Sequence, residues 1–289
     1  MNDKKLYSPK TIKKIMEQYD FKFSKKFGQN FLIDGNIIDG ICDSAEISKA
    51  DGILEIGPGI GVMTYEMCKR AKKVVAVELD KKLIPILSDN LSEYDNFKLV
   101  QGDILDIDVN EIIEKEFKGL NVKVVANLPY YITTPIIMKL LEERLNIDKI
   151  VVMVQKEVAE RISSSPGTKD YGAITLAINY YSEPKVVLNV PRSVFMPSPN
   201  VDSAVIMLDI YDEPRVKVQD SNFMFKIIKA AFGQRRKTIL NAVSSLDIGL
   251  SKEDIKNVFE KNDMDFKRRG ETFSIEEFAF LSDRIKELL

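Results

Sequence analysis

Short apolar runs alternate with amphipathic segments along the first half of the chain. The runs are rich in β-branched residues and nearly continuous, which is typical of strands buried on both faces of a parallel sheet. Between them, apolar positions recur at helical spacing. The pattern predicts an α/β domain, with strands at Gly52–Ile56, Val74–Val77, Lys98–Val100, Val122–Ala126 and Ile150–Val154 and helices at Val62–Lys69, Lys81–Leu91 and Pro135–Arg144.

The pattern changes in the second half of the chain. Lys185–Val190 and Ala204–Ile210 predict a hairpin-like pair of strands, joined by the proline-rich segment Pro191–Val201. This connection is long and carries an aromatic residue, which favours a functional loop over a tight turn. Asp212–Ser221 has the composition of a linker, and only helical patterns follow it. We therefore expect a basic arm and loop over residues 1–33, an α/β domain over 34–211 and a small all-α domain over 212–289.

Composition narrows the possible chemistry. The 289 residues are 45% apolar and 30% charged, and no apolar run reaches the ~18 residues of a membrane-spanning helix. The first residues lack the apolar core of a secretory signal, so we expect a cytoplasmic protein. With only Cys42 and Cys68, neither a disulfide framework nor a cysteine-rich metal site is expected. Because the chain contains no histidine, catalysis by a histidine base or by a Ser-His or Cys-His dyad is excluded.

Charge is distributed unevenly although the net charge is −2. Residues 1–30 carry eight lysines against three acids, and residues 221–289 carry thirteen basic against eleven acidic groups. A basic arm and tail around an acidic centre are suited to binding a polyanion at their edges. The alternative is that these lysines are ordinary surface residues, and charge alone does not decide between the two.

A glycine-dense turn follows the first predicted strand. Gly57 and Gly59 allow a ligand to approach the backbone closely, and the helix that follows offers free N–H groups. The spacing is not the G-x-G-x-x-G dinucleotide fingerprint. Glu78 and Asp103 follow the next two strands, where carboxylates can accept from ribose hydroxyls and an adenine amino group. The set predicts a nucleoside ligand without phosphates, unless Glu78 only caps a helix and Asp103 only forms a turn.

The fourth strand ends in Asn127-Leu128-Pro129-Tyr130. The Asn127 side-chain oxygen and the carbonyl of Pro129 can accept hydrogen bonds from an exocyclic amino group, and Tyr130 offers a face on which a base can stack. The alternative is a proline turn with an asparagine cap and a buried tyrosine. The position at the carboxyl edge of the sheet, where ligands bind in such folds, favours the functional interpretation.

Nine segments in the same order over nearly the whole chain resemble the ribosomal RNA small-subunit adenine N6-dimethyltransferase family. This family is related to the macrolide-resistance methyltransferases of the large subunit. The matching segments are Lys26–Asp34, Glu55–Gly61, Val77–Asp80, Gly102–Ile104, Asn127–Pro135, Val154–Arg161, Tyr171–Tyr181, Phe195–Val205 and Ala231–Leu240.

The resemblance implies a Rossmann-like class I methyltransferase fold with S-adenosylmethionine as methyl donor. The implied substrate is two adjacent adenosines near the 3′ end of 16S rRNA, in a pre-30S particle during ribosome biogenesis, and nothing requires more than a monomer. Gly57 and its neighbours would contact the amino-acid part of the donor, Glu78 the ribose and Asp103 the adenine. Asn30 and Leu32 would close over the donor, and Asn127 would face the transferred methyl group.

Other roles follow from the same resemblance. Tyr130 would stack on the target base. Phe195 would either offer a second stacking face or be an ordinary core anchor.

Two rival functions are methylation of a large-subunit adenosine that confers drug resistance, and a non-catalytic role in ribosome assembly. The segments Tyr131–Pro135, Phe195–Val205 and Ala231–Leu240 favour the small subunit. The basic residues expected to bind rRNA phosphates are Lys22, Lys25, Lys26, Arg235, Arg236 and Lys237, with a weaker case for Lys267–Arg269.

Overall fold

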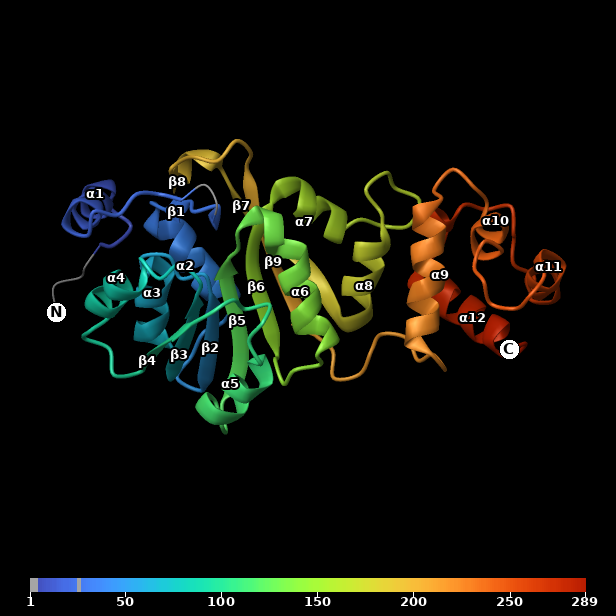
Figure 1. The fold of residues 1–289 in the computed structure, drawn as a ribbon, viewed down its shortest axis with the longest axis horizontal. Coiled ribbons are helices and arrows are strands. Elements are labelled where there is room, and N and C mark those ends of the chain that lie inside the picture. Colours follow the sequence, from blue (N-terminus) through green and yellow to red (C-terminus); the bar gives the residue numbers. More distant parts are fainter. Residues whose placement is uncertain (1–4, 25–26) are drawn as a thin grey trace. The chain divides into compact units, whose positions relative to one another are not determined.

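The computed structural model describes residues 5–24 and 27–289, and Figure 1 shows its course. The chain divides into two compact units, one of Met1–Ala159 and Pro184–Ile210, the other of Glu160–Glu183 and Tyr211–Leu289. The sequence placed residues 160–183 in the α/β domain. They group with the helical unit because Tyr171, Leu176 and Tyr180 are buried in its core.

The first unit is built on a seven-stranded sheet of order β4-β3-β2-β5-β6-β9-β7. The five strands from β4 to β6 run parallel, and β9 pairs antiparallel with β6. The predicted strands are all present, within a few residues of the expected bounds. They are β2 (Asp51–Ile56), β3 (Lys73–Glu78), β4 (Phe97–Gln101), β5 (Asn121–Asn127), β6 (Lys149–Gln155), β7 (Ser182–Val190) and β9 (Ser203–Ile210).

Both faces of the central strands are covered. Ile53 and Leu54 are adjacent on β2 and therefore point to opposite faces, yet both are fully buried, and Val124 and Val125 on β5 repeat this. Burial on both faces explains why these strands are almost continuously apolar. The helices of this unit are α1 (Pro9–Gln18), α2 (Gly35–Ser44), α3 (Val62–Arg70), α4 (Ile84–Asn90), α5 (Val109–Glu116), α6 (Thr133–Glu142) and most of α7 (Lys156–Ile162).

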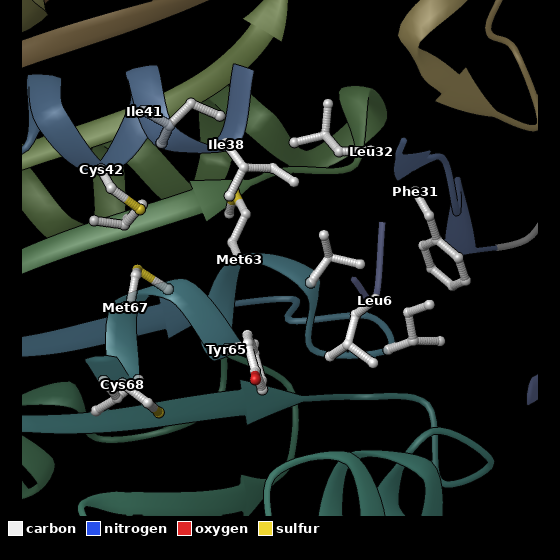
Figure 2. Close-up of a cluster of buried hydrophobic side chains, with 14 of the residues drawn as sticks. Leu6, Phe31, Leu32, Ile38, Ile41, Cys42, Met63, Tyr65, Met67 and Cys68 are labelled. Carbon is white, nitrogen blue, oxygen red and sulfur yellow. The ribbon is translucent and has the colours of Figure 1, made fainter. Parts of the chain in front are cut away.

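One core cluster fills the space between the sheet and the N-terminal helices. Figure 2 shows Ile38 and Cys42 of α2 directed toward Met63 and Met67 of α3. Burial raises the pKa of the Cys42 thiol to about 12, so this thiol is held in its neutral form. Cys42 and Cys68 are both free and buried, and they act as small apolar core residues.

A two-stranded sheet links the N-terminal segment to the proline-rich loop. β1 (Phe31–Leu32) pairs antiparallel with β8 (Phe195–Met196), with Leu32 opposite Phe195. The N–H of Ile33 extends the contact by donating to the carbonyl of Val194 at 2.9 Å. The proline-rich loop therefore packs against the segment that precedes the first predicted strand.

The second unit contains helices around its own core. Helix α10 (Ile239–Val243) begins directly after Thr238, because the Thr238 hydroxyl accepts from the N–H of Asn241 and caps the helix there. Thr238 and Arg269 also form an isolated β-bridge, which the helical pattern did not predict. The helices are α8 (Ala173–Tyr181), α9 (Ser221–Gly233), α10 (Ile239–Val243), α11 (Lys252–Lys261) and α12 (Ile275–Lys286), with the 3₁₀ turn η4 (Gly270–Thr272).

Candidate active site

A cavity lies at the carboxyl edge of the parallel strands, within the first unit. It contains the predicted residues from four strand ends together with the segment that leads into β1. Glu55, Gln29 and Tyr131 also line it, and the sequence did not single them out. The predicted residues that the structure brings together here are Asn30, Leu32, Gly57, Gly59, Glu78, Asp103, Asn127, Pro129 and Tyr130.

The glycine turn between β2 and α3 needs left-handed backbone. Gly57 has φ of 68° and Gly59 has φ of 62°, both unfavourable for a residue with a Cβ. A Cβ on Gly57 would meet no atom within 4 Å, so only its backbone conformation requires glycine. A Cβ on Gly59 would lie 2.9 Å from Cε1 of Phe31. Gly59 thus allows the Phe31 ring to pack directly against the turn.

Glu78 ends β3 and is held by two backbone groups. Its carboxylate accepts from the N–H of Gly59 at 3.3 Å and from the N–H of Asp80 at 2.7 Å. Only 6% of the residue is exposed, and burial raises the pKa of Glu78 to about 7 although these N–H groups oppose the rise. The carboxylate therefore caps the following turn and also faces a ligand cavity.

Asp103 lies beyond the end of β4 and is half-buried. One carboxylate oxygen, Oδ1, accepts from the N–H of Leu105 at 2.9 Å, which is the turn-forming role weighed from the sequence. No hydrogen bond to Oδ2 is found in the described part of the chain. Because Asp103 lines the cavity, this second oxygen is available to a ligand amino group.

Asn127 at the end of β5 has a fixed amide. Its Nδ2 donates to the backbone carbonyl of Asn30 at 3.0 Å, which leaves Oδ1 as an acceptor. The carbonyl of Pro129 differs from expectation, because it already accepts from the N–H of Ile132 at 3.1 Å and from the hydroxyl of Thr133 at 3.1 Å. Among the described residues, nothing donates to the carbonyl of Leu128. The two acceptors available side by side in the sequence are therefore Asn127 Oδ1 and the Leu128 carbonyl.

Tyr130 lines the cavity with its ring position fixed. Its hydroxyl hydrogen-bonds to Oγ of the buried Ser203 on β9 at 2.7 Å, and burial raises the pKa of Tyr130. Tyr131 also lines the cavity and is 59% exposed. Phe195, in contrast, is 3% exposed, belongs to the hydrophobic core and is not part of the cavity wall. In this structure Phe195 is therefore a core anchor, which is one of the two roles that the sequence allowed.

The segment before β1 closes one side of the cavity. Gln29 donates from Nε2 to Asp80 at 2.8 Å and accepts at Oε1 from the N–H of Ser24 at 2.7 Å. Apart from the family resemblance, no pattern in the sequence predicts this contact, since a single amide side chain fits many roles. The cavity volume is about 100 Å³. Ligand sites usually measure ~300–1,000 Å³, so we expect this segment to move outward when a nucleoside-sized ligand enters.

Glu55 is the fully buried acid of this site. The side chain on β2 is 0% exposed and neither carboxylate oxygen has a hydrogen-bond partner in the described part of the chain. Burial raises the pKa of Glu55 to about 8, and the charge of Glu78 adds to this rise. An unpaired buried carboxyl that lines a cavity is suited to a cationic ligand group.

The predicted RNA-binding residues that the structure describes lie outside this cavity. Lys22 is exposed on the first unit, whereas Lys25 and Lys26 lie outside the described residues. Arg235, Arg236 and Lys237 are exposed on the second unit.

Residues 5–24 and 27–289 contain no group of three or more metal-ligating side chains. Over the same ranges no helix is long and apolar enough to cross a membrane.

Comparison with known proteins now assigns the family. The profile of the family described as "Ribosomal RNA adenine dimethylase" matches residues 20–280 of the chain. The chain belongs to this family. The match covers the whole cavity and most of both units, so the resemblance seen in the sequence is confirmed.

Relatives at about half identity cover the full length. A ribosomal RNA small subunit methyltransferase A of Alkaliphilus oremlandii is 51% identical, covering 99% of each chain. Proteins with the same name from Clostridioides difficile and Lachnoclostridium phytofermentans are 52% and 53% identical, covering 97% and 98% of each chain.

Solved structures give the same fold. A dimethyladenosine transferase from Plasmodium falciparum has a TM-score of 0.74 at 26% identity, covering 87% of this chain and 95% of its own. The 23S rRNA methyltransferase ErmE has a TM-score of 0.67 at 25% identity, covering 89% of this chain and 100% of its own. The predicted class I methyltransferase fold is therefore confirmed.

Proposed function

We propose that this protein transfers methyl groups from S-adenosylmethionine to N6 of two adjacent adenosines near the 3′ end of 16S rRNA. The substrate would be an immature small subunit in the cytoplasm, and the protein would act as a monomer. The observation that carries the proposal is the fixed amide of Asn127. Its Oδ1 accepts no hydrogen bond from the described residues and lies in a cavity that also holds Glu78 and Asp103. The small-subunit names of the half-identical relatives support the choice of rRNA.

The residues of the cavity fit this donor. Glu78 would accept from the ribose hydroxyls and the free oxygen of Asp103 from the adenine amino group. The unpaired carboxyl of Glu55 fits the ammonium of the amino-acid part, and the open space at Gly57 leaves room for it. No phosphate-binding cation lines the cavity among the described residues, which agrees with a nucleoside that lacks phosphates.

When bound, the donor supplies a methyl group already activated on a sulfonium, which is the difficult part of the chemistry. The protein must then orient the adenine N6, whose lone pair is delocalised into the ring. Asn127 Oδ1 and the Leu128 carbonyl can accept the two N6 hydrogens and favour a more tetrahedral nitrogen. Such placement contributes up to about 7–11 kcal/mol in well-oriented systems. Methyl transfer leaves N6 cationic, and N6 then loses a proton to water without help from a strong base, so the absence of histidine is no obstacle.

The target base must leave its stack to reach the cavity, as in other enzymes that modify bases. Tyr130, fixed by Ser203, would offer one face for stacking. Phe195 could offer a second face only if the pairing of β1 with β8 opened, because its ring is now buried. We propose that Lys22, Lys25, Lys26 and the Arg235–Lys237 cluster bind rRNA phosphates, with residues 212–289 forming most of an RNA-binding domain.

A labelling experiment tests the proposed function. The purified protein would be incubated with labelled donor and small subunits from a strain that lacks the enzyme, and nucleosides would be analysed for N6,N6-dimethyladenosine. We expect label in two adjacent adenosines of 16S rRNA, located by primer extension. Large subunits serve as the control substrate. Methylation confined to large-subunit RNA would establish the rival function instead.

A further inference from the structure

A second cavity lies wholly within the C-terminal unit. Its volume is about 760 Å³, and its walls come from α7, the α7–α8 loop, the start of α8, the end of α9 and η4. Figure 1 shows the α7–α8 loop beside one end of α9. The volume is in the range of sites that bind ligands of nucleotide size, ~300–1,000 Å³. None of its residues lines the candidate active site.

The charged residues around this cavity leave free positive charge. Arg235 donates from Nε to Glu271 at 3.0 Å and from Nη2 to the carbonyl of Lys169 at 2.9 Å, so its guanidinium is fixed and Glu271 is paired. Arg161 and Lys169 are exposed, and no ion pair to either side chain is found in the described part of the chain. Asp170 is the other acid in the lining. Arg161 and Lys169, set against Asp170, therefore leave a net charge of +1 beside the Arg235–Glu271 pair.

An aromatic ring completes the wall. Phe232 is half-buried, and its ring packs against Tyr171 at a centroid distance of 5.8 Å and against Phe278 at 6.3 Å. These contacts fix the ring, while its exposed part lines the cavity. A fixed aromatic surface beside free cations is the combination by which proteins bind single-stranded nucleic acid, through base stacking and phosphate contact.

We propose that this cavity binds one unpaired nucleotide of the RNA substrate, with the phosphates at Arg161 and Lys169 and the base against Phe232. The inference rests on the proposed function, because it requires an RNA partner. The site anchors RNA and takes no part in methyl transfer, since none of its residues lines the cavity that holds Asn127. It adds Arg161, Lys169 and Phe232 to the residues that contact RNA.

Salt dependence tests the phosphate contacts. Binding of the full-length protein to small subunits from a strain that lacks the enzyme would be measured by filter binding over a range of KCl. Arg161→Ala and Lys169→Ala should each weaken binding and reduce the slope of log K against log [KCl] by about 0.7–0.9 per lost contact. Lys229→Ala removes one exposed charge from α9 outside the cavity and should keep the wild-type slope. A wild-type slope in both cavity variants overturns the proposal.

Fluorescence tests the base contact. The chain contains no tryptophan, so Phe232→Trp places a single indole in the cavity. A single-stranded oligoribonucleotide should quench it, whereas Phe280→Trp, at a 44% exposed position of α12 outside the cavity, should respond far less. An equal response of the two probes rules out stacking in the cavity. Equal quenching of the Phe232→Trp probe by adenosine monophosphate and by RNA would assign the site to free nucleotides and overturn the proposal.

The outcomes separate this inference from the proposed function. If the wild-type protein binds small subunits but never methylates them, and the two cavity variants still show the reduced salt slope, the proposed function fails and the cavity proposal stands. If the wild-type protein methylates 16S rRNA and the cavity variants bind like Lys229→Ala, the cavity proposal fails and the function stands. Thermal unfolding of each variant would verify that Arg161→Ala and Lys169→Ala keep the wild-type fold.

Discussion

Gln29 and Asp80 join two segments that lie 51 positions apart in the chain. The side-chain amide of Gln29 donates to Asp80 at 2.8 Å, and the same amide accepts from the N–H of Ser24. Asp80 in turn donates its own N–H to Glu78, the carboxylate that we propose binds ribose. The N-terminal segment is therefore connected through two hydrogen bonds to the donor site.

Gln29→Ala should weaken donor binding without stopping chemistry. The variant loses a hydrogen bond to a charged group, worth about 1.5–3 kcal/mol, and leaves the segment over the cavity less constrained. We expect the Kd for S-adenosylmethionine to rise about tenfold, while kcat at saturating donor changes little. Isothermal titration calorimetry would measure the Kd. Gln219→Ala, at an exposed position of the second unit, is the matched control. An unchanged Kd in Gln29→Ala would contradict the role of this contact.

The raised pKa of Glu78 predicts opposite pH effects on stability and binding. Because the folded pKa is about 7, above the usual value of a carboxyl, ionisation opposes folding. The stability contributed by this group is greatest below the unfolded pKa and is lost as pH rises toward about 7. Donor affinity should instead rise from about pH 6 to about pH 8, since an ionised carboxylate is the stronger acceptor for ribose hydroxyls.

Glu78→Gln tests both effects. The variant should bind donor at least about tenfold more weakly, and its free energy of unfolding without donor should be higher than wild type by up to about 3 kcal/mol near pH 8. Calorimetry and urea unfolding at several pH values would measure these quantities. Glu55→Gln is the necessary control because the pKa of Glu55 is raised to about 8 in the same cavity. A steep pH dependence of donor affinity that persists in Glu78→Gln would contradict this account.

Substitutions in the glycine turn should differ in stability. Gly57→Ala and Gly59→Ala both place a Cβ on left-handed backbone, which costs about 1–2 kcal/mol. Gly59→Ala should cost more, because its Cβ would also clash with Phe31. Urea unfolding would measure the difference, and adding Phe31→Leu to Gly59→Ala should recover part of the loss. Equal stability of the two single variants would show that Phe31 moves away without cost.

Loss of the buried ion pair between Lys123 and Asp51 should affect the stability of the fold alone. Nζ of Lys123 contacts Asp51 at 3.1 Å, and Asp51 is 1% exposed. Lys123→Met should reduce the free energy of unfolding by about 3–5 kcal/mol, because it leaves a buried charge without its cation. The double variant Lys123→Met, Asp51→Asn should recover much of the loss. Urea unfolding measures both, and a neutral effect of Lys123→Met would show that Ser48 alone satisfies Asp51.

Particular elements show how far the sequence alone could predict this structure. The strands that carry Gly57, Glu78, Asp103 and Asn127 were predictable, because burial on both faces makes them continuously apolar and the polar residues stand at their ends. The pairing of β1 with β8 was not predictable, because strands of two residues have no periodicity and the contact joins distant segments. The grouping of residues 160–183 with the helical unit likewise depends on tertiary packing.

The candidate site, like the fold, was predictable from the sequence only in part. Residue types and spacing indicated a nucleoside site and an amino group held at Asn127. They could not indicate that the carbonyl of Pro129 is engaged by Ile132 and Thr133, since those bonds arise from the 3₁₀ turn η2 (Tyr130–Ile132) that follows. The burial of Phe195 and the contact between Gln29 and Asp80 also depend on segments that are far apart in the sequence.

Asn127→Ala provides the most direct test of the central claim, that an amide oxygen fixed at the end of β5 orients the adenine N6. Dimethyladenosine formed in small subunits would be measured in a single turnover, with donor affinity measured by calorimetry on the same preparation. We predict that the rate falls by at least about 100-fold while the Kd for the donor changes by less than about tenfold. Turnover at the wild-type rate with normal donor binding would contradict the account.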